Sequence, residues 1–158
     1  MRSALPPLLL LYAALALSLA SAPRRGWGLN LAVLAVAAGV TATVPPPWRE
    51  SVFTGCWISV AMTAVAGLVC RTDRQLAWGL SLNAGLWSGA LAAVTGEPLD
   101  LLVALPTLGL LPAAAWTLRR LSFPVVRVMS SWLVAVAVLA IALACLPVTP
   151  GYLPDHLE

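Results

Sequence analysis

The sequence predicts an all-α polytopic membrane protein, a compact bundle of six transmembrane helices in one domain that covers residues 1–158. Three observations predict it: an extremely apolar composition, six long apolar runs, and a strong asymmetry in where the arginines lie. Hydrophobic residues make up 61% of the chain and charged residues 9%, whereas soluble globular chains average roughly 45–50% and roughly 25%. The mean hydropathy of +0.93 therefore indicates a chain that uses lipid as its solvent.

Six apolar runs are long enough to cross a bilayer, since a membrane-spanning helix needs roughly 20 apolar residues. The turns between them combine charged residues with proline or glycine, as expected at the level of the lipid headgroups. The fifth run is the weakest prediction because Pro106 and Pro112 interrupt it. The six runs are residues 4–22, 27–44, 51–70, 75–94, 99–118 and 128–146.

The arginines predict the orientation. With six crossings, alternate turns share a side, and one side carries seven of the nine basic residues, all of them arginine. The positive-inside rule places that side in the cytoplasm. We expect both termini on the periplasmic side of a bacterial inner membrane. The alternative at the N-terminus is a cleaved signal peptide, because Arg2, an apolar run and Ala20-Ser21-Ala22 also fit that pattern.

The runs that start at residues 4, 51 and 99 suggest a repeat of three tandem helical hairpins. Each hairpin would have arginines at its inner turn and prolines at its outer turn. The alternative is purely geometric, since two spans and two short turns produce a similar period in any compact six-helix protein.

Small residues at intervals of four form a smooth face on the third, fourth and fifth runs, and such faces let helices pack closely in lipid. The interpretation we favour is internal packing between the third and fourth spans, and the alternative is an interface with a partner. The stripes comprise Gly55, Ser59, Thr63 and Gly67 in the third run, and Ser81, Gly85 and Gly89 in the fourth.

Asn83 and Trp87 are the candidate ligand-facing residues. Asn83 is the only amide near the middle of a run, and Trp87 follows it by one helical turn, so both point the same way. The alternative role for Asn83 is a hydrogen bond between helices. Pro106 and Pro112 could add backbone carbonyls freed by a broken helix, or they could be simple kinks.

Residues for other chemistry are scarce. No run carries Asp, Glu, Lys, Arg or His near its centre, and the single histidine is His156. We therefore expect no enzyme, no metal site and no cofactor. Cys56 and Cys145 fall in the same half of the membrane, so they are either a disulfide or two small packing residues. The net charge of +3 reflects arginines facing anionic lipid and does not predict nucleic-acid binding.

Two functional hypotheses follow from the sequence. The first is a non-enzymatic component of a larger membrane assembly, with a transport system as the expected kind. The second is a self-contained small permease or binder for a weakly polar molecule, using Asn83, Trp87 and the interrupted fifth run. The expected partners are the lipid bilayer and either a membrane protein or further copies of the chain.

Overall fold

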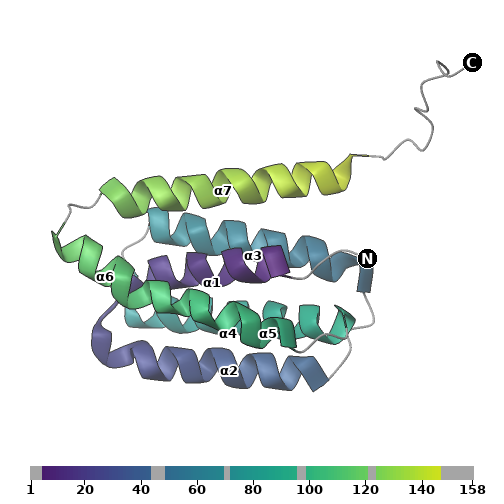
Figure 1. Cartoon of the computed structure of the whole chain (residues 1–158), viewed down its shortest axis with the longest axis horizontal. Coiled ribbons are helices and arrows are strands. Elements are labelled where there is room, and N and C mark those ends of the chain that lie inside the picture. The colour runs from purple at the N-terminus through teal and green to yellow at the C-terminus, as the bar shows by residue number, and fades with distance from the viewer. Residues whose placement is uncertain (1–4, 44–48, 70–71, 96–98, 121–123, 147–158) are drawn as a thin grey trace, which may run out of the picture.

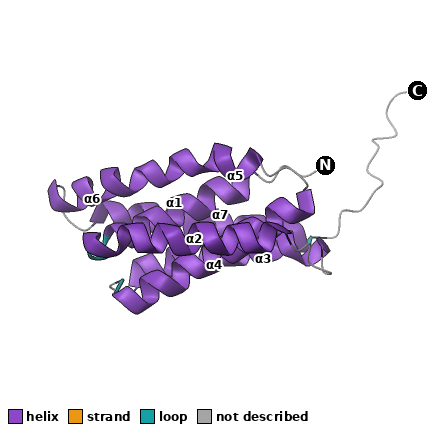
Figure 2. Cartoon of the chain, turned by 90° about the horizontal axis from the view of Figure 1, so that it is seen from below, coloured by secondary structure: helices purple, strands orange, loops and turns teal. Residues whose placement is uncertain are grey.

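A computed structural model describes residues 5–43, 49–69, 72–95, 99–120 and 124–146. Within these ranges nearly every residue is helical and there is no strand (Figure 2). The helical segments run back and forth along one common direction and form a single bundle (Figure 1). The prediction of an all-α protein is confirmed.

Proline, glycine and charged residues set the limits of the helices. Asp73 caps the fourth helix by accepting a hydrogen bond from the Leu76 N–H at 2.8 Å. Pro124 begins the last helix, where its missing N–H has no cost. The helices are α1 (Leu5–Ala20), η1 (Arg24–Gly26), α2 (Trp27–Thr43), α3 (Arg49–Val69), α4 (Arg74–Thr95), α5 (Leu99–Ala104), η2 (Leu105–Gly109), α6 (Leu110–Arg120) and α7 (Pro124–Cys145), where η marks a 3₁₀ turn.

Four helical segments are long and apolar enough to cross a membrane: Arg24–Thr43, Ser51–Val69, Leu99–Trp116 and Arg127–Cys145. The first predicted span corresponds to α1, whose 16 residues measure about 24 Å, less than the hydrocarbon core of about 30 Å. The fourth corresponds to α4, which has 22 residues but is less apolar than these four segments. A membrane protein is supported, and six crossings stay a prediction.

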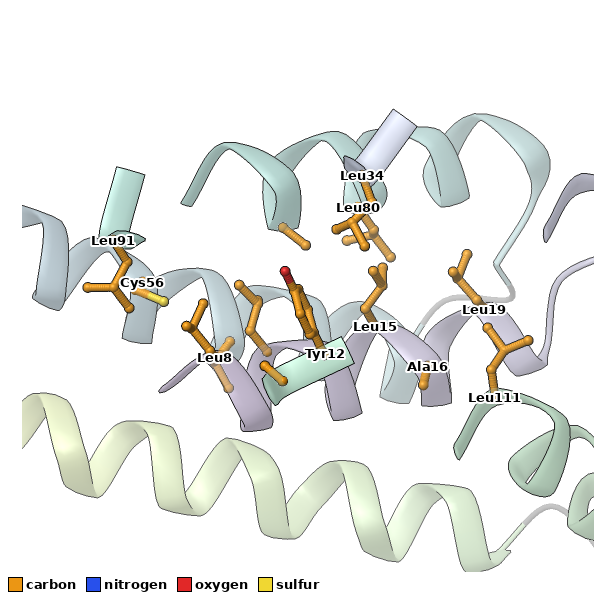
Figure 3. Packing of buried hydrophobic residues seen from close by; sticks show 14 of the residues in the cluster. Leu8, Tyr12, Leu15, Ala16, Leu19, Leu34, Cys56, Leu80, Leu91 and Leu111 are labelled. Atoms are coloured by element: carbon orange, nitrogen blue, oxygen red, sulfur yellow. The ribbon is translucent and has the colours of Figure 1, made fainter. Parts of the chain in front are cut away.

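The short helix α1 lies at the centre of the bundle. Nine of its 16 residues are buried, and it contacts α3, α4, α5, η2, α6 and α7. Leu15 points toward Leu34 and Leu80, whereas Leu19 lies beside Leu111 (Figure 3). The side chains of α1 are therefore part of the core on which α3, α4 and α6 pack.

Helices that follow one another in sequence are not the ones that pack most extensively. The largest contacts join α2 to α4 and α3 to α7, and α1 makes little contact with α2. The three-hairpin interpretation therefore does not describe the packing. A short turn brings two helix ends together, but the fit of their side chains decides which helices pack along their length.

Most arginines gather at one end of the bundle. In the described ranges, η1, the start of α4, the end of α6 and the start of α7 all lie at the same end (Figure 1). These segments carry Arg24, Arg25, Arg74, Arg119, Arg120 and Arg127. The opposite end has Arg49 with Glu50 and Asp100. The structure thus contains the charge asymmetry, and we refer to the first end as the arginine end.

Candidate functional site

Asn83 bonds to a neighbouring helix. Its Nδ2 donates a hydrogen bond to the Ser59 Oγ of α3 at 2.6 Å, where Ser59 is buried and Asn83 is partly exposed. Such a bond is a favoured contact in lipid, where an unpaired amide is costly. In this structure Asn83 therefore joins α3 to α4, as the alternative interpretation of this residue expected.

Trp87 covers a glycine of the same neighbouring helix. A Cβ atom added at Gly55 of α3 would overlap the six-membered ring of Trp87. The indole therefore occupies the space that a side chain at position 55 would need. Asn83 and Trp87 do share one face of α4, but that face packs on α3. The hydrogen bond to Ser59 holds Asn83, and the contact with Gly55 holds the Trp87 ring.

The C-terminal half of the α3 stripe, Thr63 and Gly67, meets α1 and not α4. Ser18 of α1 donates hydrogen bonds to the carbonyl oxygens of Ala14 at 2.9 Å and of Thr63 at 3.0 Å. An added Cβ at Gly67 would lie 2.7 Å from the Ser18 Oγ. Thr63 and Gly67 therefore admit α1 to the centre of the bundle.

The glycines of α4 meet α2. An added Cβ at Gly85 would lie 2.6 Å from the Leu34 carbonyl oxygen, and one at Gly89 would overlap the Ala38 carbonyl oxygen and Thr41 Oγ1. The small residues thus serve internal packing, but Gly85 and Gly89 pack on α2 and not on α3 as the sequence suggested. Ser81 is fully buried on the same helix, and its Oγ has no hydrogen-bond partner among the described residues.

The two prolines lie away from Asn83 and Trp87. Pro106 is exposed in η2, and Pro112 is exposed in α6. The segment that contains them packs mainly across α1. Thr107 donates a hydrogen bond to the Ala104 carbonyl oxygen at 2.6 Å, which satisfies one acceptor at the break. The structure therefore does not bring the four predicted ligand-facing residues together.

Among the described residues, the cysteines form no disulfide and the side chains that could bind a metal form no cluster. Cys56 is buried, Cys145 is exposed, and both are free thiols, so the disulfide left open by the sequence is not formed. Among the described residues no three His, Cys, Asp or Glu side chains lie close enough to hold a metal ion.

A recess at the arginine end was not predicted from the sequence. It consists of two adjoining cavities of about 310 and 460 Å³ that share Ala22, Pro23 and Arg74 in their walls. Arg25 and Asn30 also line the first cavity, and Thr72 and Asp73 also line the second.

Two contacts form the frame of this recess. The Trp27 Nε1 donates a hydrogen bond to the Leu19 carbonyl oxygen at 3.1 Å and so ties the start of α2 to the end of α1. Asp73 caps α4 through the Leu76 N–H. Both contacts fix the short turns that carry Arg25 and Arg74. The Arg-Arg-Gly and Asp-Arg turns were visible in the sequence as loops, but only the fold places them beside each other.

The outer face of α2 is also unusual. Gly28, Ala32, Ala35 and Gly39 are all exposed, and their spacing of four, three and four residues places them along one side of the helix. An added Cβ at Gly28 or at Gly39 would meet no atom within 4 Å. We call these four residues the outer α2 stripe. Its mixed spacing of four and three residues distinguishes it from the stripes of strict four-residue spacing on α3 and α4.

Comparison with known proteins gives no relative from which a function could be transferred. No family model, no curated protein and no solved structure matches this chain.

Proposed function

We propose that the chain is a non-enzymatic integral membrane component of a larger assembly, and that this assembly is a transport system. The observation that carries the proposal is the outer α2 stripe. The small residues of α3 and α4 are used for packing inside the bundle, whereas the stripe on α2 faces outward with free space above it.

The stripe suits a helix better than it suits lipid. Glycine and alanine let two helix backbones approach closely, and this approach is a main source of affinity between helices in a bilayer. Acyl chains adapt to any apolar surface and gain nothing from missing side chains. Beside the stripe, α2 and α4 form an apolar groove of about 480 Å³ lined by residues such as Val36, Val40 and Leu86. A stripe next to a groove matches the ridge of a partner helix.

The alternative of a self-contained permease or binder gains no support from the contacts. Asn83 is bonded to Ser59, and Trp87 fills the space over Gly55. The centre of the bundle is occupied by α1. A transport path between these helices would require breaking several of these contacts.

Affinity purification of the tagged full chain from native membranes tests the proposal. We expect a membrane protein partner to co-purify in fixed stoichiometry. The double variant Ala32→Leu and Gly39→Leu should reduce its recovery more than about tenfold, because bulky groups in a close-packed contact cost about 1–3 kcal/mol each. The control is Ala135→Leu with Ala142→Leu, which adds nearly the same bulk, one carbon less, to exposed positions of α7.

The identity of the co-purified protein tests the narrower part of the proposal. A permease, channel or transport ATPase subunit would support a transport system, and an enzyme of lipid or cell-wall synthesis would contradict it. Recovery of the chain alone as a defined oligomer would assign the stripe to a second copy. If the partner were recovered equally with the α2 and the α7 double variants, the outer α2 stripe would not be part of the interface.

We also propose that the chain resides in a bacterial inner membrane with its arginine end in the cytoplasm, because arginine-rich turns are retained on that side. Cys145 is exposed at the opposite end, so a membrane-impermeant maleimide should label it in cells whose outer membrane has been made permeable. In a variant whose native cysteines have been replaced, the new thiol of Ser21→Cys lies at the arginine end. The same maleimide should label it only after the cells are lysed. The reverse result would invert the topology.

A further inference from the structure

The recess at the arginine end has two features that internal packing does not explain, namely free cationic side chains and unpartnered buried polar groups. Its two cavities adjoin at Arg74, and together they offer room for a group the size of a lipid headgroup.

The guanidinium groups of Arg25 and Arg74 have no acidic partner in the part of the chain that the structure describes. Neither forms an ion pair with any side chain in the described ranges. Arg74 lies over the ring of Trp78 at 5.7 Å from its centroid, a contact that holds its stem but leaves its N–H donors available. Asp73 also lines the recess, but one of its oxygens is engaged by the Leu76 N–H at the start of α4. The walls therefore offer an excess of positive charge.

The buried polar groups lack partners. Asn30 is 2% exposed and lines the first cavity, and its Oδ1 accepts no hydrogen bond from the described residues. Thr72 is 3% exposed and lines the second, and its Oγ1 is likewise unpartnered within the described ranges. An unpaired buried polar atom costs about 1–3 kcal/mol, so each such atom at a cavity wall calls for a partner such as a bound water, ion or ligand.

We propose that this recess binds a phosphate group, carried either by an anionic lipid headgroup or by a free phosphate compound. Arginine donors match phosphate oxygens in geometry and charge. Basic pockets between helices at the membrane boundary are where lipid phosphates are held. Asn30 and Thr72 can donate hydrogen bonds as well as accept them, and Asp73 adds an acceptor, so the favoured ligand combines a phosphate with a donor such as the hydroxyl groups of a glycerol headgroup.

Native mass spectrometry of the purified full chain in an uncharged detergent tests the proposal. The lipid probes are dioleoylphosphatidylglycerol and dioleoylphosphatidylcholine, which have the same tails. The third probe is inorganic phosphate, and its binding is measured as a shift in the temperature of thermal unfolding. We expect phosphatidylglycerol to bind more tightly than phosphatidylcholine. Arg25→Gln and Arg74→Gln should each weaken its binding about fivefold, the effect of one basic residue on an anionic lipid.

Arg24→Gln is the matched control for Arg74→Gln. Arg24 stacks on Trp27 at 5.6 Å, as Arg74 does on Trp78, so each variant removes one charge and one ring contact. Arg24 does not line either cavity. Asn30→Leu gives a second readout: it should weaken phosphatidylglycerol binding and leave the ligand-free protein at least as stable, because it removes an unpaired acceptor.

Each outcome decides the question. Selective phosphatidylglycerol binding that depends on Arg25 and Arg74 but not on Arg24 assigns the ligand to lipid. The same dependence for inorganic phosphate assigns it to a free phosphate compound. Equal affinity for the two lipids without phosphate binding, or an Arg24→Gln effect as large as that of Arg74→Gln, would overturn the proposal and leave general attraction to anionic surfaces.

Discussion

Gly85→Ala tests the most extensive helix contact of the bundle, which joins α2 to α4. The new methyl group would lie 2.6 Å from the Leu34 carbonyl oxygen and 2.7 Å from the Ala37 Cβ, where ordinary contacts begin at 3.4 Å. The carbonyl oxygen is part of the α2 backbone and cannot turn aside. The two helices must therefore separate locally by about 0.8 Å, which loses dispersion contacts along the whole seam.

The expected cost is large for one methyl group. Overpacking of this kind destabilises proteins by about 1–3 kcal/mol. Gly79→Ala on the same helix is the matched control, because its Cβ would meet no atom within 4 Å. Alanine favours helix over glycine by about 0.5–1 kcal/mol, so Gly79→Ala should be neutral or stabilising. Both variants gain the same helix propensity, so they should differ by the overpacking cost alone, about 1–3 kcal/mol.

Unfolding of the purified full chain by sodium dodecyl sulfate in mixed micelles measures this difference, with helix content and tryptophan fluorescence as independent probes. Coincident transitions from the two probes would justify a single free energy of unfolding. If Gly85→Ala proved as stable as Gly79→Ala, the close approach of α2 and α4 through Gly85 would be refuted.

Two further predictions concern the interior. Asn83→Leu and Ser59→Ala should each weaken the α3–α4 contact, and a double-mutant cycle should give a coupling of about 0.6–1.7 kcal/mol for their hydrogen bond of 2.6 Å; zero coupling would show that the bond does not contribute. Leu15→Ala, at a fully buried position of α1, should cost about 2–5 kcal/mol because it leaves a cavity. Val36→Ala, which is 66% exposed, should change the free energy of unfolding little, and equal losses for the two variants would contradict a central α1.

The candidate sites show where sequence reasoning succeeded and where it stopped. The sequence showed that Asn83 is an amide within an apolar run and therefore needs a hydrogen-bond partner. Its partner Ser59 lies 24 positions earlier in the chain, and nothing in the sequence pairs the two residues. The recess was missed for a similar reason. Arg25 and Arg74 lie in turns far apart in the sequence, and their proximity arises only from the packing of α2 on α4.

The sequence by itself determined that the chain is helical and suited to a membrane, because long apolar runs must satisfy their backbone hydrogen bonds internally. It also determined that arginine gathers at one end, since alternate turns of a bundle share a side. Only the tertiary structure decided that α1 is central, that Gly85 and Gly89 face α2, and that the outer α2 stripe is free. In lipid the inner and outer faces of a helix are both apolar, so periodic polarity cannot tell them apart, and the fit of small and large side chains makes the choice.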